Sequence, residues 1–499
     1  MSKRRVTINK NKIMKTVLLL LSFACFFASC SNSEDGTNTP PPAPPSENNG
    51  NVVGSADVWV TSGNKSKLFS QQPSADIYDN NATERPSVTV DFSQQFQEID
   101  GFGAALTGSS AYVINQMNAA QKDALLKDLF SDDEGIGLSY LRLTVGASDF
   151  SLNNSTYNDL PAGQTDPNLE QFSIADDEEH VIPVLQLVSG YAPDIKIMSS
   201  PWSAPAWMKT TGSLGGGSLK PEWYDAYGDY FVKYLNAYAA HGINIDAVTP
   251  QNEPLHETSG YPTMKMTAAE QADFIKNSLG PKFQLAGLNT KIIAYDHNFD
   301  QPSYPITVLG DSEAYPYIDG SAFHAYAGDV SAMNQVHAAF PEKNLYFTEI
   351  SGGEWSTDFS ANLKWNISNI FIGTTANWSK NVLLWNLALN SNHGPTNGGC
   401  MDCRGVVTVS SSGQVTKNVE YYCLAHFSKF VRPGAKRVHS TNFDNSLGLK
   451  NITFINTDGT KVMVILNESS SVRNIAIKDG DTKINYTIEA NAVATIVWQ

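Results

Sequence analysis

The chain has 499 residues, of which 41% are hydrophobic and 17% charged, and its formal net charge is −16. This composition excludes a disordered or coiled-coil protein and indicates a globular chain with one large domain and room for a smaller one. The negative charge argues against nucleic acid and anionic lipid as ligands, because a surface that binds phosphate is basic. A neutral ligand held by aromatic and hydrogen-bonding groups suits the chain better.

The N-terminus is typical of an export signal. In residues 1–30, basic side chains precede the apolar run VLLLLSFACFFA, which is too short to cross a bilayer comfortably. The run ends in FASC and so resembles a bacterial lipobox, with Cys30 as the lipidated first residue of the mature chain; a plain secretory signal is the alternative. Residues 31–54 are rich in Pro, Ser and Asn and predict a tether. We expect a lipid-anchored, surface-exposed protein of the bacterial outer membrane, or otherwise a periplasmic one.

Short strand patterns lie at both ends of the remaining chain. Residues 55–95 contain ADVWVTS and PSVTVDF, and residues 433–499 contain ITFINTDG, KVMVILNES, VRNIAIKDG, INYTIEA and AVATIVWQ. These runs alternate in hydrophobicity, are separated by turn residues and have almost no helical periodicity. We predict one antiparallel β-sandwich built from both chain ends.

The central block, residues 96–432, has a different rhythm. Helical patterns such as NAAQKDALLKDLF and PEWYDAYGDYFVKYLNAYAAHG separate short apolar runs. The runs are FQEIDGFGAAL, LSYLRLTVG, IKIMSSPW, IDAVTPQNEP, KIIAYDHN, SAFHAYAG, NLYFTEISG and NVLLWNLAL. Eight strands with crossover segments between them predict a (β/α)8 barrel, an α/β fold.

Polar and aromatic side chains recur where the predicted barrel strands end. In such a barrel the C-terminal strand ends form the face that binds substrate. The strand-end residues are Arg142, Asp149, Trp202, Trp207, Asn252, Glu253, His324, Tyr326, Glu349, Trp385 and Asn386. Their recurrence on several strands predicts one site at this face.

Two of these side chains, Glu253 and Glu349, are carboxylates on the fourth and seventh predicted strands. Barrel geometry places those strands across the mouth from each other, so the two carboxylates can converge. Cleavage of a glycosidic bond needs such a pair, one to protonate the leaving oxygen and one to attack or stabilise the anomeric carbon. A separation near ~5 Å predicts retention of configuration.

The motifs IDGFGAALT, SSPWSAPAWMKTTG, NEP, TEISG and WNLALN together resemble glycoside hydrolase family 30, the glucosylceramidase-like family. The similarity covers essentially the whole mature chain, barrel and sandwich. It implies that Glu253 is the acid/base and Glu349 the nucleophile of a double displacement through a covalent glycosyl-enzyme. It further implies that Asn252 binds the sugar 2-hydroxyl and that Arg142 supports the nucleophile. The other substrate-binding residues that it implies are Asp149, Trp202, His324, Tyr326 and Trp385.

These roles carry expectations about charge. Glu253 has to stay protonated near neutral pH, and we expect burial and the second carboxylate to raise its pKa. Glu349 has to be ionised, which Arg142 favours. The acids Glu257 and Glu354 lie beyond their strands in loops and are expected to be surface or subsite residues.

The loop after the eighth strand, NSNHGPTNGGCMDCRGVVTV, resembles the β-1,6-glucanase branch of the family. We therefore expect a retaining β-1,6-glucan hydrolase whose endo or exo action stays open. A β-glucosidase or glucosylceramidase is the alternative, and a non-catalytic glycan-binding lipoprotein conflicts with the presence of both carboxylates.

The cysteines of that loop, Cys400 and Cys403, predict a loop disulfide or buried thiols. A zinc knuckle is disfavoured, since no second ligand pair accompanies them. We expect a monomer that needs no metal or cofactor.

Overall fold

The computed structural model describes residues 49–499, so the predicted signal, Cys30 and most of the predicted tether lie outside the described residues. Within the described part, no helix has the length and apolar character needed to span a bilayer.

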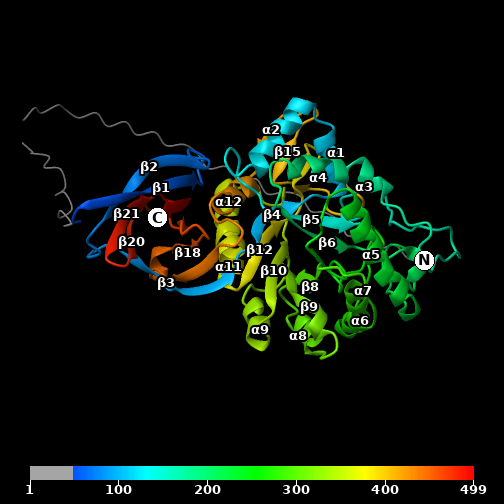
Figure 1. Cartoon of the computed structure of the whole chain (residues 1–499). Helices are drawn as coiled ribbons and strands as arrows, with labels where there is room; N and C mark the ends of the chain where they lie inside the picture. The colour runs from blue at the N-terminus through cyan, green and yellow to red at the C-terminus, as the bar shows by residue number, and fades with distance from the viewer. Residues whose placement is uncertain (1–48) are drawn as a thin grey trace, which may run out of the picture. The chain divides into compact units, whose positions relative to one another are not determined.

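The barrel is a closed ring of eight parallel strands, as predicted. In the ring each strand lies beside its neighbours in the sequence, and the last closes onto the first. Figure 1 shows these strands with helices such as α5, α8 and α9 on the outside. The strands are β4 (Gly101–Ala105), β5 (Tyr140–Val145), β6 (Lys196–Pro201), β7 (Ala247–Val248), β8 (Lys291–Asn298), β9 (Ile318–His324), β10 (Asn344–Glu349) and β12 (Ser379–Leu384).

The helices follow the barrel strands in the alternating order that the sequence predicts. The two predicted helical patterns form α2, which begins with an Asn118 capping box, and α5, whose buried face is rich in tyrosine. The helices are α1 (Gly108–Asn115), α2 (Ala119–Phe130), α3 (Ala175–Glu179), α4 (Val181–Ser189), α5 (Tyr224–Ala240), α6 (Ala268–Phe274), α7 (Gly280–Leu285), α8 (Ser303–Gly310), α9 (Ala332–Ala339), α10 (Phe359–Trp365), α11 (Gly373–Ala376) and α12 (Val419–Ser428).

The barrel interior is packed rather than hollow. A buried cluster fills it, with one side chain from each of seven strands: Tyr140, Met198, Ala247, Ile293, Ala322, Tyr346 and Leu383. Glycine is required where the wall is tightest, because a Cβ on Gly103 would lie 1.7 Å from the carbonyl oxygen of Tyr140. This packing leaves the C-terminal strand ends as the place where polar side chains can gather.

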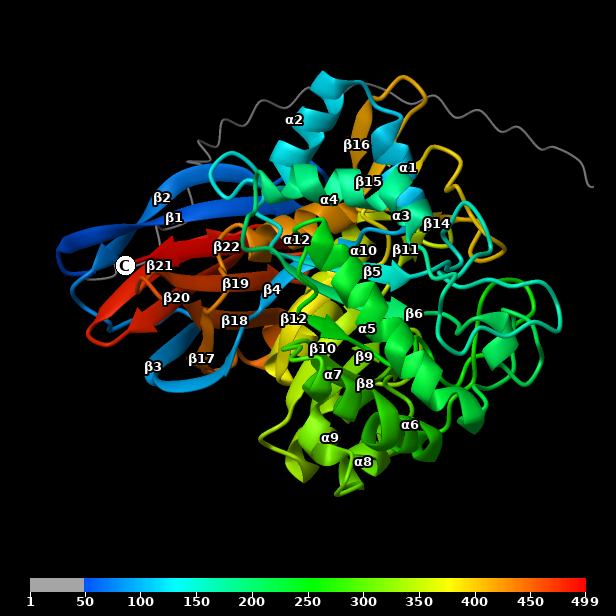
Figure 2. The same cartoon turned by 45° about the vertical axis from the view of Figure 1, so that its right-hand side comes forward.

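Strands from both chain ends form the second domain, as predicted, and their hydrogen bonds run around a ring of nine strands. Figure 2 shows β18, β19 and β22 side by side in it. The strands are β1 (Val52–Ser62), β2 (Ser70–Tyr78), β3 (Ser87–Glu98), β17 (Lys436–Ser440), β18 (Leu449–Ile455), β19 (Lys461–Asn467), β20 (Arg473–Asp479), β21 (Thr482–Ile488) and β22 (Ala492–Trp498).

Three details of this domain differ from the expectation. The pair β3–β20 is parallel, whereas the prediction was a purely antiparallel domain; no hairpin joins these two strands, so either direction is open to them. Strand β1 begins at Val52, within the predicted tether, because its backbone pairs with β2 there. Strand β3 continues past residue 95 to Glu98. The bounds and directions of these strands depend on which strands pair with each other, and composition does not reveal that.

Two small sheets extend the loops after the seventh and eighth barrel strands. The first pairs β11 (Gly352–Gly353) with β14 (Cys403–Arg404), and the second joins β13 (Ala388–Asn390), β15 (Val407–Val409) and β16 (Val415–Lys417). Both follow directly from strands that carry predicted site residues.

Candidate active site

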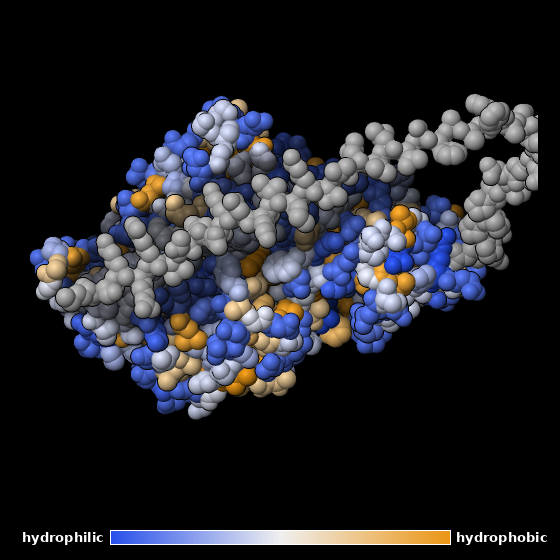
Figure 3. Space-filling model, turned by 180° about the vertical axis from the view of Figure 1, so that it is seen from behind, coloured by the Kyte–Doolittle hydropathy of each residue, from blue (hydrophilic) through white to orange (hydrophobic). Residues whose placement is uncertain are grey.

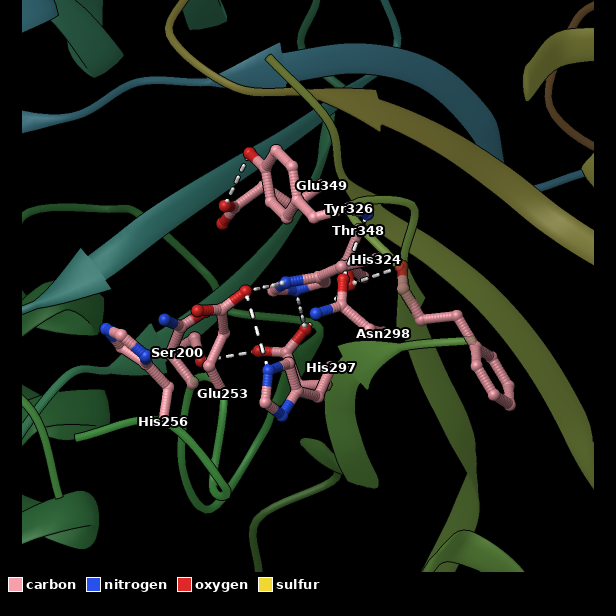
Figure 4. Close-up of polar contacts among 12 residues, drawn as sticks. Ser200, Glu253, His256, His297, Asn298, His324, Tyr326, Thr348 and Glu349 are labelled. Carbon is pink, nitrogen blue, oxygen red and sulfur yellow. Dashed lines mark hydrogen bonds and ion pairs between the residues drawn. The ribbon is translucent and has the colours of Figure 1, made fainter. Parts of the chain in front are cut away.

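Glu253 and Glu349 converge at the C-terminal end of the barrel. A carboxylate oxygen of Glu253, a ring nitrogen of His324 and a carboxylate oxygen of Glu349 all lie within 4.8 Å of one another. Figure 4 shows Glu253 grouped with His297 and His324, and Tyr326 beside Glu349. A carboxylate separation of about 5 Å leaves no room for a water between nucleophile and anomeric carbon and is the geometry of retention. The pairing predicted across the mouth is therefore present.

The side chain of Glu349 is held from two sides. Arg142 donates from Nη1 to its Oε2, and the Tyr326 hydroxyl donates to its Oε1 over 2.9 Å. Burial outweighs the opposing charges of His324 and Arg142, so the pKa of Glu349 lies above its usual value. The two donors fix the carboxylate in one orientation and stabilise its charged form, as a nucleophile requires.

The pKa of Glu253 differs from the expectation. Burial raises this pKa, but the hydrogen bond to His324 and the charge of His324 outweigh burial, so the pKa lies below its usual value. Burial would also lower the pKa of His324, yet Glu349, Asp296 and Glu253 raise it to about 9. In the free enzyme the proton therefore resides on His324, 3.0 Å from Glu253 through Nδ1.

His324 is fully buried, and the substrate-binding role that the resemblance implies for it stays a prediction. Its Nδ1 faces Glu253 and its Nε2 faces Asp296, both at 3.0 Å. Its ring places a positive charge beside the acid/base Glu253.

Asp296, which the sequence analysis did not single out, connects the two halves of the site. Its Oδ2 accepts from Arg142 over 2.8 Å, and its Oδ1 faces His324. Three hydroxyl groups also donate to this fully buried carboxylate, from Ser200, Thr249 and Thr348. These contacts, with those to Arg142 and His324, outweigh burial and hold the pKa of Asp296 well below its usual value. The Asp296 carboxylate thus contacts both Arg142, which binds the nucleophile, and His324, which contacts the acid/base.

Unusual backbone geometry aims these side chains. Tyr295 and Asp296 have φ of 75° and 71°, and the register of β8 shifts at this point, which is a β-bulge. Glu253 has φ of 45° and Asn386 has φ of 63°. Left-handed non-glycine residues cost about 1–3 kcal/mol each, and both they and bulges occur near functional sites, where bulges re-aim side chains. Three barrel strands, β7, β8 and β12, therefore reach the site through strained ends.

The bulge also brings His297 toward the acid/base. Its Nε2 lies 3.9 Å from Oε1 of Glu253, and burial lowers its pKa to about 4, so the ring is neutral. The fifth predicted strand ends in YDHN, where three polar residues follow an apolar run. This pattern is the sequence feature that could indicate Asp296 and His297 as site residues.

Arg142 is fully buried and organises the base of the site. It donates to Asn252 over 2.6 Å, and its guanidinium lies 5.0 Å from the ring of Trp202 and 5.6 Å from that of Trp385. The two indoles stack on each other at 5.1 Å and are each 3% exposed. They therefore support Arg142 and form the base of the site, with little area open to a sugar.

Asp149 lies beside the same site, where burial and the charges of Glu349 and Glu253 raise its pKa well above the usual value. The loop after β12 closes over it: the backbone N–H of Asn397 donates to the Asp149 carbonyl, and Gly399 packs against the Asp149 side chain. A disulfide joins Cys400 to Cys403 in this loop, which settles the alternatives left open for them.

The cluster of Glu253, His324 and Glu349 also has the spacing of a three-ligand metal site. Its groups already have partners, because Arg142 pairs with Glu349 and both ring nitrogens of His324 face carboxylates. A cation would have to displace one of these partners. The donor set fits two proton-handling carboxylates.

Known proteins share this architecture. Residues 99–431 match the glycosyl hydrolase family 30 TIM-barrel domain, and residues 434–496 match the β-sandwich domain of that family. The endo-1,6-β-D-glucanase neg1 of Aspergillus fumigatus is 37% identical over 398 residues, 74% of this chain and 78% of that protein. The lysosomal acid glucosylceramidase of Mus musculus is 31% identical over 442 residues, 83% of each chain.

A solved structure described as the endo-β1,6-glucanase BT3312 superposes with a TM-score of 0.82 at 35% identity, covering 89% of this chain and 99% of that one. Both family domains are present, in the order barrel then β-sandwich. The chain belongs to glycosyl hydrolase family 30.

Proposed function

We propose that the protein is a retaining, endo-acting hydrolase of β-1,6-glucan. The observation that carries this proposal is the pair Glu253 and Glu349, whose carboxylate oxygens come within 4.8 Å at the open end of the barrel. Two relatives described as endo-β-1,6-glucanases, and the cysteine loop after β12, support this substrate.

In the first step, a carboxylate oxygen of Glu349 attacks the anomeric carbon while the bond to the leaving oxygen breaks. Glu253 gives the leaving oxygen a proton. Glu253 receives this proton from Nδ1 of His324 over the 3.0 Å contact. The leaving group in a β-1,6-glucan is a primary alkoxide, so protonation is essential. Asn252, oriented by Arg142, can donate to the 2-hydroxyl from its Nδ2.

In the second step, water attacks the glycosyl ester. The negative charge of Glu349, which raises the pKa of His324 in the free enzyme, is absent from the ester. Glu253 accepts the proton of the attacking water as general base, and the ester bond to Glu349 breaks. Two inversions at the anomeric carbon give net retention.

A glucosylceramidase would need a surface to receive the lipid part of its substrate. On the face shown in Figure 3, apolar residues form small separate patches among hydrophilic ones. Large exposed apolar patches mark membrane or lipid contacts, and the described apolar residues visible on this face lie singly or in small groups. The preference for a polysaccharide rests on the relatives described as endo-β-1,6-glucanases.

Incubation with pustulan, laminarin and an aryl β-glucoside tests the proposal. We expect gentio-oligosaccharides of several lengths from pustulan, because an endo-acting enzyme cuts within the chain, and little product from laminarin. Chromatography of the products and proton NMR of the first-formed anomer provide the readout. Activity on the aryl glucoside alone would favour the β-glucosidase alternative, and binding without release of sugar would reject the enzyme.

We also propose that Cys30 carries a lipid anchor at the bacterial outer membrane, on the strength of the lipobox-like FASC and the tether after it. Detergent phase partitioning of the full-length protein tests this. Wild type should enter the detergent phase and Cys30→Ala should not; equal partitioning of both would reject the anchor.

A further inference from the structure

An exposed tryptophan, Trp355, follows the strand that carries the nucleophile. Strand β10 ends at Glu349, and Trp355 lies in the turn after β11, at the same end of the barrel as the active site. Its side chain is 58% exposed, although exposure of so large an apolar group gains nothing for folding. It is not among the catalytic contacts described above.

Glycine makes the position of this indole possible. A Cβ on Gly353 would lie 1.9 Å from Cζ3 of Trp355, so any other residue there would displace the ring. The benzo part of the indole therefore covers the glycine backbone, and the rest of the ring faces solvent.

The turn that carries Trp355 is fixed by the cysteine loop. Strand β11 pairs with β14, which contains Cys403 and Arg404, and Figure 2 shows these two strands together. Nη1 of Arg404 donates to the carbonyls of Gly353 and Ser356, each over 3.0 Å, so it spans the turn.

Two further contacts hold this frame. The Glu420 carboxylate accepts from Nε and Nη2 of Arg404, and the backbone N–H of Glu354 donates to the Asp402 carbonyl. The disulfide Cys400–Cys403 constrains the segment that leads into β14. The GGCxxCRG segment thus has a structural use: it presents an exposed indole on a rigid support.

We propose that Trp355 is a sugar-stacking platform for a glucosyl unit distant from the scissile bond, and that it favours long glucan chains over short substrates. The inference rests on the proposed function, because the ligand is a further unit of the same polysaccharide. Indole rings bind the C–H face of a pyranose by apolar contact, and a platform held in place before binding loses little conformational entropy when the ligand arrives.

Trp355→Ala tests the proposal through its dependence on chain length. We expect kcat/KM on pustulan and on gentio-oligosaccharides of about six units to fall roughly tenfold, about 1.4 kcal/mol, chiefly through KM. The same constant for an aryl β-glucoside should stay within about twofold of wild type, because that substrate does not reach the platform. Trp355→Phe should recover most of the loss, since it keeps an aromatic face.

Trp365→Ala is the matched control, since Trp365 is also exposed, at 45%, but lies on α10 outside the site. It should behave as wild type on every substrate. Equal loss on polymer and aryl glucoside in Trp355→Ala would indicate a disturbed nucleophile loop and overturn the proposal. An unchanged KM for the polymer would overturn it as well.

A binding measurement separates this inference from the proposed function. In affinity electrophoresis through gels containing pustulan or laminarin, the inactive Glu349→Gln protein should be retarded by the glucan that it recognises, and Trp355→Ala in that background should be retarded less. If wild type cleaves neither glucan, the proposed function fails, and this retardation still decides the role of Trp355. Equal retardation of both proteins in both gels would reject it.

Discussion

Glu349→Gln should reduce turnover of every β-glucoside by on the order of 10⁴-fold or more, because glutamine cannot form the glycosyl ester. Glutamine keeps the shape of the side chain and can still accept a hydrogen bond from Arg142. Because the pKa of Glu349 is raised and that of Asp296 is well below its usual value, loss of the Glu349 charge should lower the melting temperature less than loss of the Asp296 charge. Adding azide to a smaller variant, Glu349→Gly, should restore cleavage and give the α-glycosyl azide. A β-azide product would place the nucleophile elsewhere.

Glu253→Gln should divide the two chemical steps. With a dinitrophenyl β-glucoside, whose leaving group needs no proton, glycosylation should remain measurable and a burst of phenolate should precede slow turnover. On pustulan the same variant should be nearly inactive, because its leaving group is a poor one. Stopped-flow absorbance measures the burst, and azide should accelerate turnover with formation of the β-azide.

Glu257→Gln is the control for both variants. Glu257 lies four residues beyond Glu253 and is exposed, and its carboxylate accepts from the backbone N–H of Gly217 and lies 3.8 Å from Nζ of Lys265. Its activity should stay near that of wild type. Equal loss in Glu253→Gln and Glu349→Gln on the dinitrophenyl substrate would contradict the assignment of acid/base and nucleophile.

The barrel and the carboxylate pair could be predicted from sequence because each rests on a local pattern. Apolar runs of strand length, separated by helices, specify the barrel, and a polar residue directly after such a run lies at its open end. Glu253 and Glu349 satisfy this rule. The helices α2 and α5 follow from capping and apolar spacing in the same way.

Properties that depend on contacts between distant segments could not be predicted. The pKa of Glu253 is lowered because the chain brings His324, whose protonated form Glu349 and Asp296 favour, within 3.0 Å. Asp296 itself points inward only because β8 has a bulge at Tyr295, and a regular strand with the same sequence would aim it differently. The parallel pairing of β3 with β20 likewise depends on strands from opposite chain ends.

Asp296→Asn should then be among the most damaging changes outside the carboxylate pair. An amide has the size of the carboxylate but no charge. Its NH2 group would face either Arg142 or His324, and both of these are donors at that position. Breaking a buried ion pair from one side costs about 3–5 kcal/mol. We expect kcat/KM on pustulan to fall on the order of 10²-fold or more, with a lower melting temperature.

The pH profile distinguishes a role in catalysis from a role in stability alone. His324 has a raised pKa, about 9, so the protonated state that supplies Glu253 is present below that pH and lost as pH rises through it. Asp296 is one of the carboxylates that raise this pKa, beside Glu349 and Glu253, so Asp296→Asn should move the alkaline limb of kcat/KM to lower pH. Thr348→Val removes one hydroxyl donor from Asp296 but keeps its charge, so its limb should stay in place. An unmoved limb in Asp296→Asn would show that Asp296 does not act through His324, and that its contact with Arg142 accounts for its place in the site.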